Sequence, residues 1–279
     1  MQSIHSLAEF QSYRKKIPVS AHPVGLVPTM GALHEGHLSL IRKASECNTV
    51  IVTIFVNPTQ FNDPRDLENY PRNIERDLAL LEKEKVDLVF IPSAEEMYPV
   101  PDTRKFDFGN LDKVMEGLHR PGHFNGVAQV VSKLFDIIKP ERAYFGQKDF
   151  QQLTIIRELV RMLNFKIEIV SCPVIREKNG LAMSSRNELL SPAERENAAG
   201  LFRVLKEATN WKNVLSVKEV KERAASELSA IPDANPEYFE IVDSKTLDPI
   251  INWEHEGTIV ACLAVKINQV RLIDNLIFD

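Results

Sequence analysis

Residues 24–37 read VGLVPTMGALHEGH, and this stretch decides the fold class of the N-terminal part of the chain. The apolar run Val24–Pro28 predicts a buried strand, and the apolar spacing over Gly36–Glu46 predicts a helix. Gly31 and Gly36 let the backbone approach a ligand closely, because they carry no side chain. The start of the helix offers backbone N–H groups to an anion. The stretch therefore predicts a strand, a turn and a helix arranged around a phosphate.

Strands and helices alternate outward from this unit. Four further strands are predicted at Val50–Val56, Asp87–Ile91, Ala143–Phe145 and Ile167–Val170. Helices are predicted at Ser3–Lys16, Asn73–Lys85, Val127–Ile138 and Asp149–Leu163, the last with Asp149 as its N-cap. This alternation predicts an α/β fold with a parallel sheet and helices on both faces. In such open sheets, ligands bind beyond the carboxyl ends of the strands.

The pattern changes after about Ile175. Two long helices are predicted at Ser191–Lys212 and Val217–Leu228, followed by strands at Tyr238–Val242, Thr258–Val265 and Val270–Ile277 with a turn near Ile267–Gln269. Long helices followed by clustered strands indicate a smaller α+β domain. We therefore predict two domains, residues 1–175 and residues 176–279.

Composition excludes several classes of protein. The net charge is −5, so the chain has no general electrostatic attraction to nucleic acid or to acidic lipid. The three cysteines, Cys47, Cys172 and Cys262, lie far apart without a CxxC pair, which argues against a disulfide framework or a structural zinc site. The N-terminus has no apolar signal region, and the longest apolar run is too short to span a bilayer. We expect a soluble, cytoplasmic protein with no nucleic-acid or membrane partner.

Polar residues follow two further predicted strands, and a third polar segment lies at the predicted domain boundary. Asn57 and Gln60, after the strongest strand, carry neutral amides that can hydrogen-bond a hydroxylated or carboxylated small molecule. Lys148 stands beside a predicted helix start, where a point charge and backbone donors suit a phosphate. The segment Asn179–Asn187 carries two hydroxyls and a guanidinium, Ser184, Ser185 and Arg186, which can stabilise charge as pyrophosphate departs.

Each segment alone also fits an ordinary structural role. His34 and His37 could be loop histidines, the Asn57–Gln60 region a proline turn, Lys148 a solvated charge, and the Ser-Ser-Arg segment a polar interdomain linker. A solvated acid is the default interpretation of Asp77 inside a charged helix. The basic turn His119–Phe124 has no role that chemistry alone can assign.

Taken together, the segments resemble the pantothenate synthetase family of pantoate–β-alanine ligases. His34-Glu35-Gly36-His37 matches the His-x-Gly-His signature of adenylyl-transferring α/β enzymes. Five family segments occur in order: PTMGALHEGH at Pro28–His37, FVNPTQF at Phe55–Phe61, RPGHFNGV at Arg120–Val127, GQKDFQQ at Gly146–Gln152 and LAMSSRN at Leu181–Asn187. The resemblance is dense over the first two-thirds of the chain and loose over the last third. Gln147 stands where many members of the family carry Glu.

The resemblance implies a homodimeric enzyme with a Rossmann-like N-terminal domain and a smaller C-terminal domain that begins with the Ser-Ser-Arg loop. It implies ATP-dependent ligation of (R)-pantoate and β-alanine to pantothenate through a pantoyl-adenylate, with release of AMP and pyrophosphate. Catalytic roles would fall to His34, His37, Lys148, Ser184, Ser185 and Arg186. ATP would contact Met30, Gly31, Ala32, Leu33, His34, Glu35, Gly36, His37, Gly146, Gln147, Lys148, Asp149, Ile175, Met183, Ser184, Ser185 and Arg186.

The same resemblance implies a pantoate site and a cation. Pantoate would contact Gln60 and Gln152, with Asn57 nearby and Arg120 carried over more weakly. Asp77 matches an acid placed near Mg2+ in the family.

Two other classes of function compete with a ligase. A nucleotidyltransferase of the same fold would share the His-x-Gly-His segment, but it would lack the paired glutamines Gln60 and Gln152. A nucleotide-sensing binding protein would not need the Ser-Ser-Arg loop, because it does not stabilise a departing pyrophosphate. The acidic pI and the lack of an anticodon-binding extension disfavour a tRNA ligase.

Overall fold

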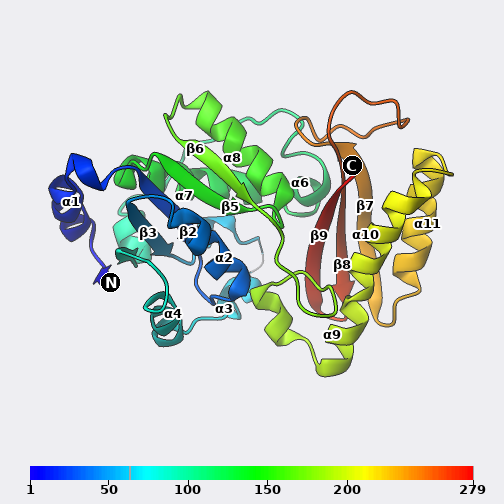
Figure 1. The fold of residues 1–279 in the computed structure, drawn as a ribbon, viewed down its shortest axis with the longest axis horizontal. Helices are drawn as coiled ribbons and strands as arrows, with labels where there is room; N and C mark the ends of the chain where they lie inside the picture. The colour runs from blue at the N-terminus through cyan, green and yellow to red at the C-terminus, as the bar shows by residue number, and fades with distance from the viewer. Residues whose placement is uncertain (63, 279) are drawn as a thin grey trace. The chain divides into compact units, whose positions relative to one another are not determined.

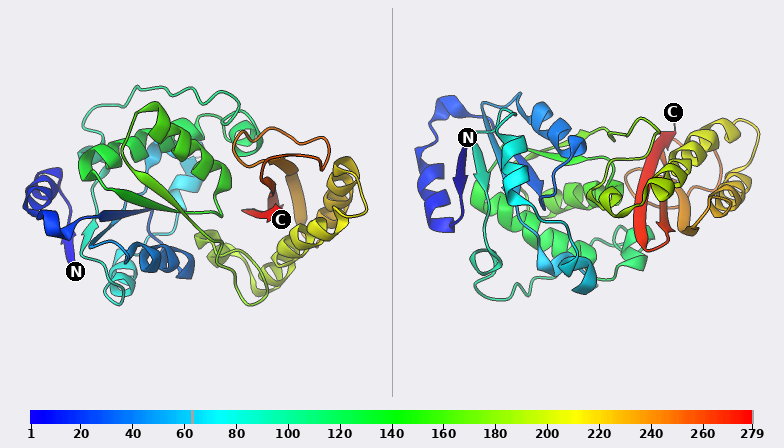
Figure 2. Two further views of the ribbon diagram at one scale, coloured as in Figure 1. Left: turned by 45° about the horizontal axis from the view of Figure 1, so that its top comes forward. Right: turned by 90° about the horizontal axis from the view of Figure 1, so that it is seen from below.

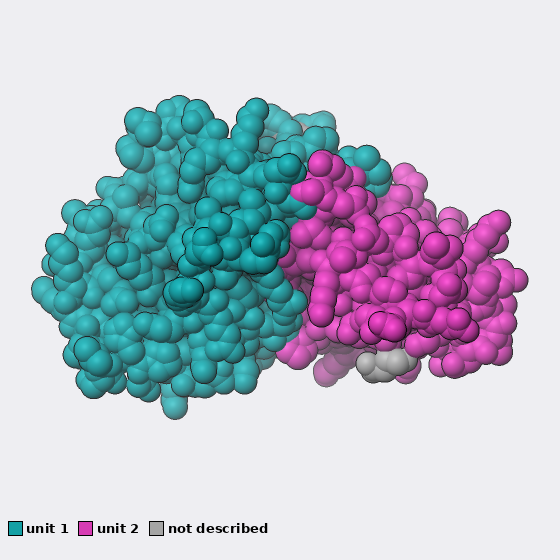
Figure 3. All heavy atoms as spheres, turned by 90° about the horizontal axis from the view of Figure 1, so that it is seen from above, with its two compact units in different colours: residues 1–108, 117–146, 155–172 teal, residues 109–116, 147–154, 173–279 magenta. Residues whose placement is uncertain are grey.

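Two units divide the residues that the computed structural model describes, which are 1–62 and 64–278. Unit 1 contains residues 1–108, 117–146 and 155–172, and unit 2 contains residues 109–116, 147–154 and 173–279 (Figure 3). The predicted division assigned all of residues 1–175 to one domain, whereas residues 109–116, 147–154 and 173–175 cluster with unit 2. The first two of these segments are joined because the Gln151 side chain bonds to the backbone of Leu111, Val114 and Glu116. Both are tied to the sheet of unit 2, since Glu116 accepts from Tyr238 and Arg271 and Asn275 donates to the Gln147 and Lys148 carbonyls. No local pattern in the sequence indicates these contacts.

Six parallel strands form the sheet of unit 1, in the order β1-β4-β3-β2-β5-β6 (Figure 1). Their bounds are Gln2–Ile4 (β1), Val24–Thr29 (β2), Thr49–Ile54 (β3), Leu88–Phe90 (β4), Arg142–Gly146 (β5) and Glu168–Cys172 (β6). All six residues of β3 are buried, as expected of a β-branched strand inside a parallel sheet. The strand order reverses between β2 and β5, and this switch point is where open α/β sheets bind ligands. The predicted α/β fold is confirmed.

Helices lie on both faces of this sheet (Figure 2). α2 (Glu35–Ala44) packs against β2, β3, β5 and β6 through its apolar face. The other helices and helical turns up to β6 are α1 (Leu7–Lys16), η1 (Val19–Ala21), η2 (Pro58–Gln60), α3 (Pro64–Glu68), α4 (Ile74–Leu81), α5 (Ala94–Met97), α6 (Met115–His119), α7 (His123–Ile138) and α8 (Phe150–Met162).

The first predicted helix begins later than expected. Residues 2–4 form the edge strand β1, which pairs with β4, and the helix α1 starts at Leu7. The Ser6 side chain accepts a hydrogen bond from the Glu9 N–H and holds Ser6 in an extended conformation. The N-cap therefore separates the strand from the helix, and the apolar spacing alone did not locate it.

Unit 2 contains an antiparallel sheet in the order β7-β8-β9, covered by helices. Its elements are η3 (Ser185–Leu189), α9 (Pro192–Ala198), α10 (Gly200–Trp211), α11 (Val217–Ser229), β7 (Ala234–Asp243), β8 (Ile259–Ile267) and β9 (Val270–Phe278). The predicted helix over Ser191–Lys212 is divided into α9 and α10 at Ala199. A Cβ atom on Gly200 would lie 2.9 Å from Ile231 Cδ1, so a larger residue here would displace the Ile231 side chain. The smaller α+β unit is confirmed.

Three further observations complete the fold. Cys47, Cys172 and Cys262 are free thiols, and all three are buried. Burial raises the pKa of Cys172 to about 11, although the nearby Lys43 opposes this change.

Within residues 1–62 and 64–278, no helix is long and apolar enough to cross a bilayer.

Candidate active site

The turn between β2 and α2 has a backbone that few residues can adopt. Gly31 and Ala32 both lie in the left-handed region, with φ values of 80° and 50°. A Cβ atom on Gly31 would lie 2.9 Å from Asp77 Oδ2 and 3.1 Å from Ile54 Cγ2. Glycine is therefore required at position 31 by its conformation and by the closeness of its neighbours.

Asp77 holds this turn from helix α4. The Ala32 N–H donates to Asp77 Oδ2 over 2.9 Å, and the Leu33 N–H donates to Asp77 Oδ1 over 2.8 Å. The Asp77 side chain is 1% exposed, so the default interpretation of a solvated acid is wrong. Among residues 1–62 and 64–278, no group of three or more His, Cys, Asp and Glu side chains is placed to hold a metal ion. A magnesium contact of Asp77 stays a prediction.

His34 and His37 share the first turn of α2. The Gly36 N–H donates to His34 Nδ1 over 3.1 Å, and the His34 N–H donates to His37 Nδ1 over 3.3 Å. Because both Nδ1 atoms accept, the neutral form of each ring carries its proton on Nε2. The ring centroids lie 4.1 Å apart, so this end of the helix carries two neighbouring Nε2–H donors. Glu35 is exposed and pairs with Arg42.

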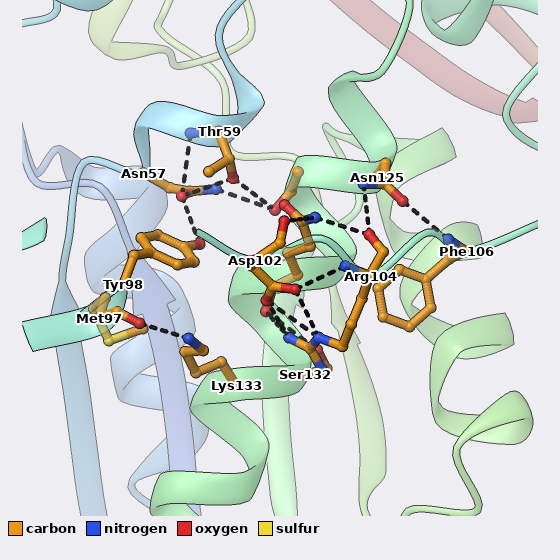
Figure 4. A network of polar contacts seen from close by, with 12 residues as sticks. Asn57, Thr59, Met97, Tyr98, Asp102, Arg104, Phe106, Asn125, Ser132 and Lys133 are labelled. Atoms are coloured by element: carbon orange, nitrogen blue, oxygen red, sulfur yellow. Dashed lines mark hydrogen bonds and ion pairs between the residues drawn. The ribbon is translucent and has the colours of Figure 1, made fainter. Parts of the chain in front are cut away.

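Asn57 is an internal link of unit 1. Its side chain is 1% exposed and donates to Gln60 Oε1 and to the Gly126 carbonyl, each over 3.1 Å. Its Oδ1 accepts hydrogen bonds from the Tyr98 hydroxyl at 2.8 Å and from the Thr59 hydroxyl at 3.1 Å (Figure 4). Asn57 is thus positioned to orient Gln60, whose Nε2 lies 3.2 Å from Met30 Sδ.

The basic turn at His119–Phe124, which chemistry alone could not assign, supports Gln60 from a second side. His123 Nε2 lies 3.2 Å from Arg120 Nη1 and acts as the acceptor, since a guanidinium only donates. His123 Nδ1 then carries the proton and donates to the Gln60 carbonyl over 2.8 Å. A Cβ atom on Gly126 would lie 2.3 Å from the Thr59 carbonyl oxygen, so α7 can approach η2 this closely only with glycine there.

Lys148 and its neighbours belong to unit 2. The Lys148 side chain is 19% exposed and lies 3.7 Å from Asp149 Oδ1. The Asp149 carbonyl accepts from the Leu153 N–H in the first turn of α8. Gln152 is partly exposed, whereas Gln151 is buried and donates to the carbonyls of Leu111 and Val114. Of these two adjacent glutamines, Gln151 has an internal structural role and Gln152 retains exposed surface.

The segment that leads to Ser184 is a hydrogen-bonded hairpin. The Met183 N–H donates to the Ile175 carbonyl, and the Glu177 N–H donates to the Leu181 carbonyl. Asn187, 2% exposed, donates to Glu177 Oε1 over 2.8 Å. These bonds do not fit a polar linker.

The hydroxyl and guanidinium residues follow this hairpin directly. Ser184 is the N-cap of η3, and its hydroxyl accepts from the Arg186 N–H over 3.2 Å. Ser185 is 9% exposed, and Met183, Ser184 and Arg186 are partly exposed. Ser184, Ser185 and Arg186 therefore lie at the start of a short helical turn with a defined backbone.

The predicted site residues fall into two sets. Unit 1 holds Met30–His37, Asn57, Gln60, Asp77, Arg120 and Gly146, and unit 2 holds Gln147–Asp149, Gln152, Ile175 and Met183–Arg186. Contacts within unit 1 join Asp77 to Ala32 and Leu33, and Gln60 to Asn57 and Met30. Within unit 2, hydrogen bonds join Met183 to Ile175 and Arg186 to Ser184. Sequence reasoning missed Tyr98 and His123 as supports of Gln60. The sequence offered one signal, which was the place of His123 beside Arg120 in the RPGHF turn.

Comparisons with known proteins agree with one another. The family model described as Pantoate-beta-alanine ligase matches residues 2–277. The pantothenate synthetase of Bacteroides thetaiotaomicron is 50% identical over 277 residues, which are 99% of this chain and 98% of that protein.

Solved structures give the same result. The pantothenate synthetase of Thermus thermophilus superposes with a TM-score of 0.92 at 43% identity, covering 99% of both chains. The pantoate-beta-alanine ligase of Francisella tularensis, complexed with beta-gamma ATP and beta-alanine, superposes with a TM-score of 0.83 at 36% identity and covers 99% of this chain and 97% of that one.

Proposed function

Because this chain belongs to the pantoate–β-alanine ligase family and so joins pantoate to β-alanine with ATP, we propose that the residues described above form its ATP and pantoate sites. One observation carries the assignment. In unit 1, the β2–α2 turn at the switch point of the sheet carries two histidines whose Nε2–H groups are donors. Such donors at a helix N-terminus suit a phosphate.

The reaction runs through an acyl-adenylate in this proposal. A pantoate carboxylate oxygen attacks the α-phosphorus of ATP, and pyrophosphate leaves. The amine of β-alanine then attacks the acyl carbon, AMP leaves, and the new amide nitrogen loses a proton. No protein nucleophile is needed, so the protein aligns the reactants and excludes water from the adenylate.

Six residues stabilise charge on the phosphates. His34 and His37 donate through Nε2, Lys148 supplies a point charge, and Ser184, Ser185 and Arg186 supply hydroxyls and a guanidinium. His37 is the proposed proton donor. Removing one such donor costs ~3 kcal/mol of transition-state stabilisation. The remaining ATP contacts come from Met30–Leu33, Glu35, Gly36, Gly146, Gln147, Asp149, Ile175 and Met183.

Pantoate is held by amide groups in this proposal. Gln60 and Gln152 contact the substrate directly. Asn57 and Arg120 act through Gln60, because Asn57 bonds to its side chain and Arg120 bonds to the histidine that holds its carbonyl. The β-alanine site is proposed from the Francisella tularensis enzyme, whose structure contains beta-alanine.

Magnesium enters this proposal with the nucleotide. Both Asp77 oxygens already accept backbone N–H groups, so this carboxylate does not fit the centre of a protein-made metal cage. Mg2+ in nucleotide enzymes is commonly held by substrate phosphates with few carboxylates. We therefore propose that the ATP phosphates would hold Mg2+ with Asp77 nearby, and that the ion would supply charge neutralisation there.

Four further proposals concern the organisation and location of the protein. We propose a homodimer and two domains, residues 1–175 and residues 176–279. We also propose a cytoplasmic location and no nucleic-acid partner, as the composition indicates. Sedimentation would test the dimer through a mass twice that of the chain.

Pyrophosphate exchange tests the mechanism. Labelled pyrophosphate should enter ATP when pantoate and magnesium are present and β-alanine is absent, because the adenylate forms before the amine reacts. Exchange should stop when pantoate is omitted. A requirement for β-alanine would contradict the adenylate order, and exchange that needs a phosphorylated acceptor would indicate nucleotidyl transfer.

A further inference from the structure

Strand β9 carries two adjacent buried polar residues. Asp274 is 4% exposed and Asn275 is 2% exposed, although they lie in the sheet of a unit with an apolar core. The Asn275 N–H donates to Asp274 Oδ1 over 2.8 Å. Buried polar groups are costly unless they are bonded, so the partners of these two side chains indicate their purpose.

Asn275 holds the backbone beside Lys148. Its Nδ2 donates to the carbonyls of Gln147 and Lys148, each over 2.9 Å. The Gln147 side chain in turn donates to Asn275 Oδ1 over 3.4 Å. One amide group therefore fixes two successive peptide units, and with them the direction in which the Lys148 side chain leaves the backbone.

Asp274 holds the hairpin that leads to the Ser-Ser-Arg segment. Arg176 donates to both of its oxygens, over 2.6 and 3.0 Å, in a bidentate pair. The same guanidinium donates to the Gly180 carbonyl over 3.1 Å and lies 3.7 Å from the centre of the Phe202 ring. Arg176 also forms an isolated β-bridge with Ala182, two residues before Ser184.

Stability alone is a weak reason for this arrangement. Burial raises the pKa of Asp274, while Arg176, the Asn275 N–H and Lys148 oppose that change. A buried ion pair often contributes no more stability than well-packed apolar side chains of similar volume. A buried polar cluster that bonds to two separate substrate-facing segments is therefore better explained by what it positions.

We propose that Asp274 and Asn275 are positioning residues for the adenylation step, which together set the Lys148 segment and the hairpin before Ser184–Arg186 from one strand. The inference rests on the proposed roles of Lys148 and of Ser184–Arg186 at the phosphates. Neither positioning residue needs to contact ATP, because each acts through the backbone or through Arg176.

The first test compares Asn275→Ala with Asp243→Ala. Asp243 is a matched control, because its Oδ1 accepts the N–H groups of Lys245 and Thr246 and its side chain is 9% exposed. Asn275 and Asp243 belong to the same sheet, and each buried side chain bonds two backbone groups in a turn outside it, so both variants should lose stability. Asn275→Ala alone should also slow pyrophosphate exchange at saturating ATP, roughly tenfold to a hundredfold, because small displacements of catalytic groups cost this much.

A double-mutant comparison separates positioning from general destabilisation. If Asn275 acts through Lys148, Asn275→Ala should slow exchange much less in a Lys148→Ala background than in the parent. Asp274→Asn should likewise slow exchange much less in an Arg186→Ala background than in the parent. Arg176→Lys should slow exchange about as much as Asp274→Asn, because a lysine cannot form the bidentate pair.

The outcomes are distinct. The inference would be overturned if Asn275→Ala slowed exchange by the same factor in both backgrounds. It would also be overturned if a folded Asn275→Ala enzyme exchanged pyrophosphate as fast as Asp243→Ala. If Lys148→Ala and Arg186→Ala themselves keep normal exchange, the proposed phosphate site is wrong and the inference falls with it. Should Asn275→Ala not fold, Asp274→Asn, which keeps the shape of the side chain and replaces one oxygen with an NH2 group, decides the question by the same comparison.

Discussion

The turn at residues 30–37 in unit 1 is held by its own backbone conformation and one carboxylate, whereas the hairpin at residues 175–183 in unit 2 is held by a relay of side chains that ends on β9. The first needs Gly31 and Asp77. The second needs Arg176 and Asp274 together with bonds across the hairpin. The turn contains, and the hairpin precedes, groups that are proposed to bind phosphate. A phosphate-binding group can therefore be held by local backbone geometry in one segment and by distant polar contacts in another.

The largest effect is expected where a charge meets the phosphates. Lys148→Ala should reduce pyrophosphate exchange by roughly a hundredfold or more, because it removes one donor from the developing charge. Circular dichroism should show an unchanged fold. Lys178→Ala is the control, since Lys178 is exposed on the hairpin and bears the same charge. Near-normal turnover of Lys148→Ala would show that Lys148 is only a surface charge. The comparison would then lose the lysine that unit 2 is proposed to supply to the phosphates.

A second prediction breaks the turn of unit 1. Asp77→Asn replaces one acceptor of the Ala32 and Leu33 N–H groups with an NH2 group, so it should destabilise the protein by about 1–3 kcal/mol. Turnover should fall roughly tenfold to a hundredfold as the histidines move. Urea unfolding and steady-state kinetics would measure both effects.

The matched variant is Glu75→Gln, which neutralises an exposed acid on the same helix and should change little. A parallel rise in the Mg2+ concentration needed for half-maximal activity would favour a direct magnesium contact. Unchanged stability and activity of Asp77→Asn would refute the role of this carboxylate in the turn.

A smaller effect is expected at the pantoate site. Gln60→Ala should raise the KM for pantoate about fivefold, since a lost hydrogen bond costs ~1 kcal/mol. ATP binding, measured by calorimetry without pantoate, should stay unchanged. Gln11→Ala, at an exposed position of α1, is the control. An equal loss of ATP affinity would contradict the assignment of Gln60 to pantoate.

The smallest effect is expected at Asp243 and concerns stability alone. Like Asp77, Asp243 accepts two backbone N–H groups in a turn, so it is the reference for Asp77. Burial opposes ionisation of Asp243, but hydrogen bonds from His255 and from the N–H groups of Thr246 and Lys245 lower its pKa to about 2. Because the pKa is depressed on folding, the stabilisation is present above the unfolded value near 3.9 and is lost as the pH falls through about 2. The contribution is on the order of 2 kcal/mol.

Asp243→Asn should therefore flatten the change in unfolding free energy between about pH 4 and pH 2. Urea titrations across this range would measure it, and turnover at neutral pH should remain normal. An unaltered pH profile would mean that the Asp243 carboxylate is not the group that titrates.

Local patterns predicted most of the sheet of unit 1 and the segments of the site. The apolar run before Gly31 and the β-branched run at Val50–Val56 located two central strands, β2 and β3, since short strands buried on both faces leave a clear composition. The edge strand Gln2–Ile4 was missed because it has three residues and lies next to a helix. Five segments in order were sufficient to indicate the family from the sequence alone.

The supports of the site could not be predicted in this way. Asp77 looked like one acid among several on a charged helix, and only its contact with residues 32 and 33 distinguishes it. His123 reaches Gln60 across 63 positions of sequence. Asp274 and Asn275 fall in the last third of the chain, where the resemblance was loose. Periodicity reports which face of an element is apolar, but it does not report which distant polar atom the other face meets.

The dependence of Lys148 on β9 has a consequence for the order in which the enzyme matures. Asn275 lies 127 residues after Lys148, and Asp274 lies 98 residues after Arg176. A ribosome adds roughly 5–20 residues per second, so both segments leave it several seconds before their anchor is made. Unit 1 can form its β2–α2 turn during that interval, since Asp77 is already present. A nascent chain halted before Asp274 would therefore carry the histidine turn in place and the lysine segment without its anchor, and adenylation would reach its full rate only after β9 joins the sheet.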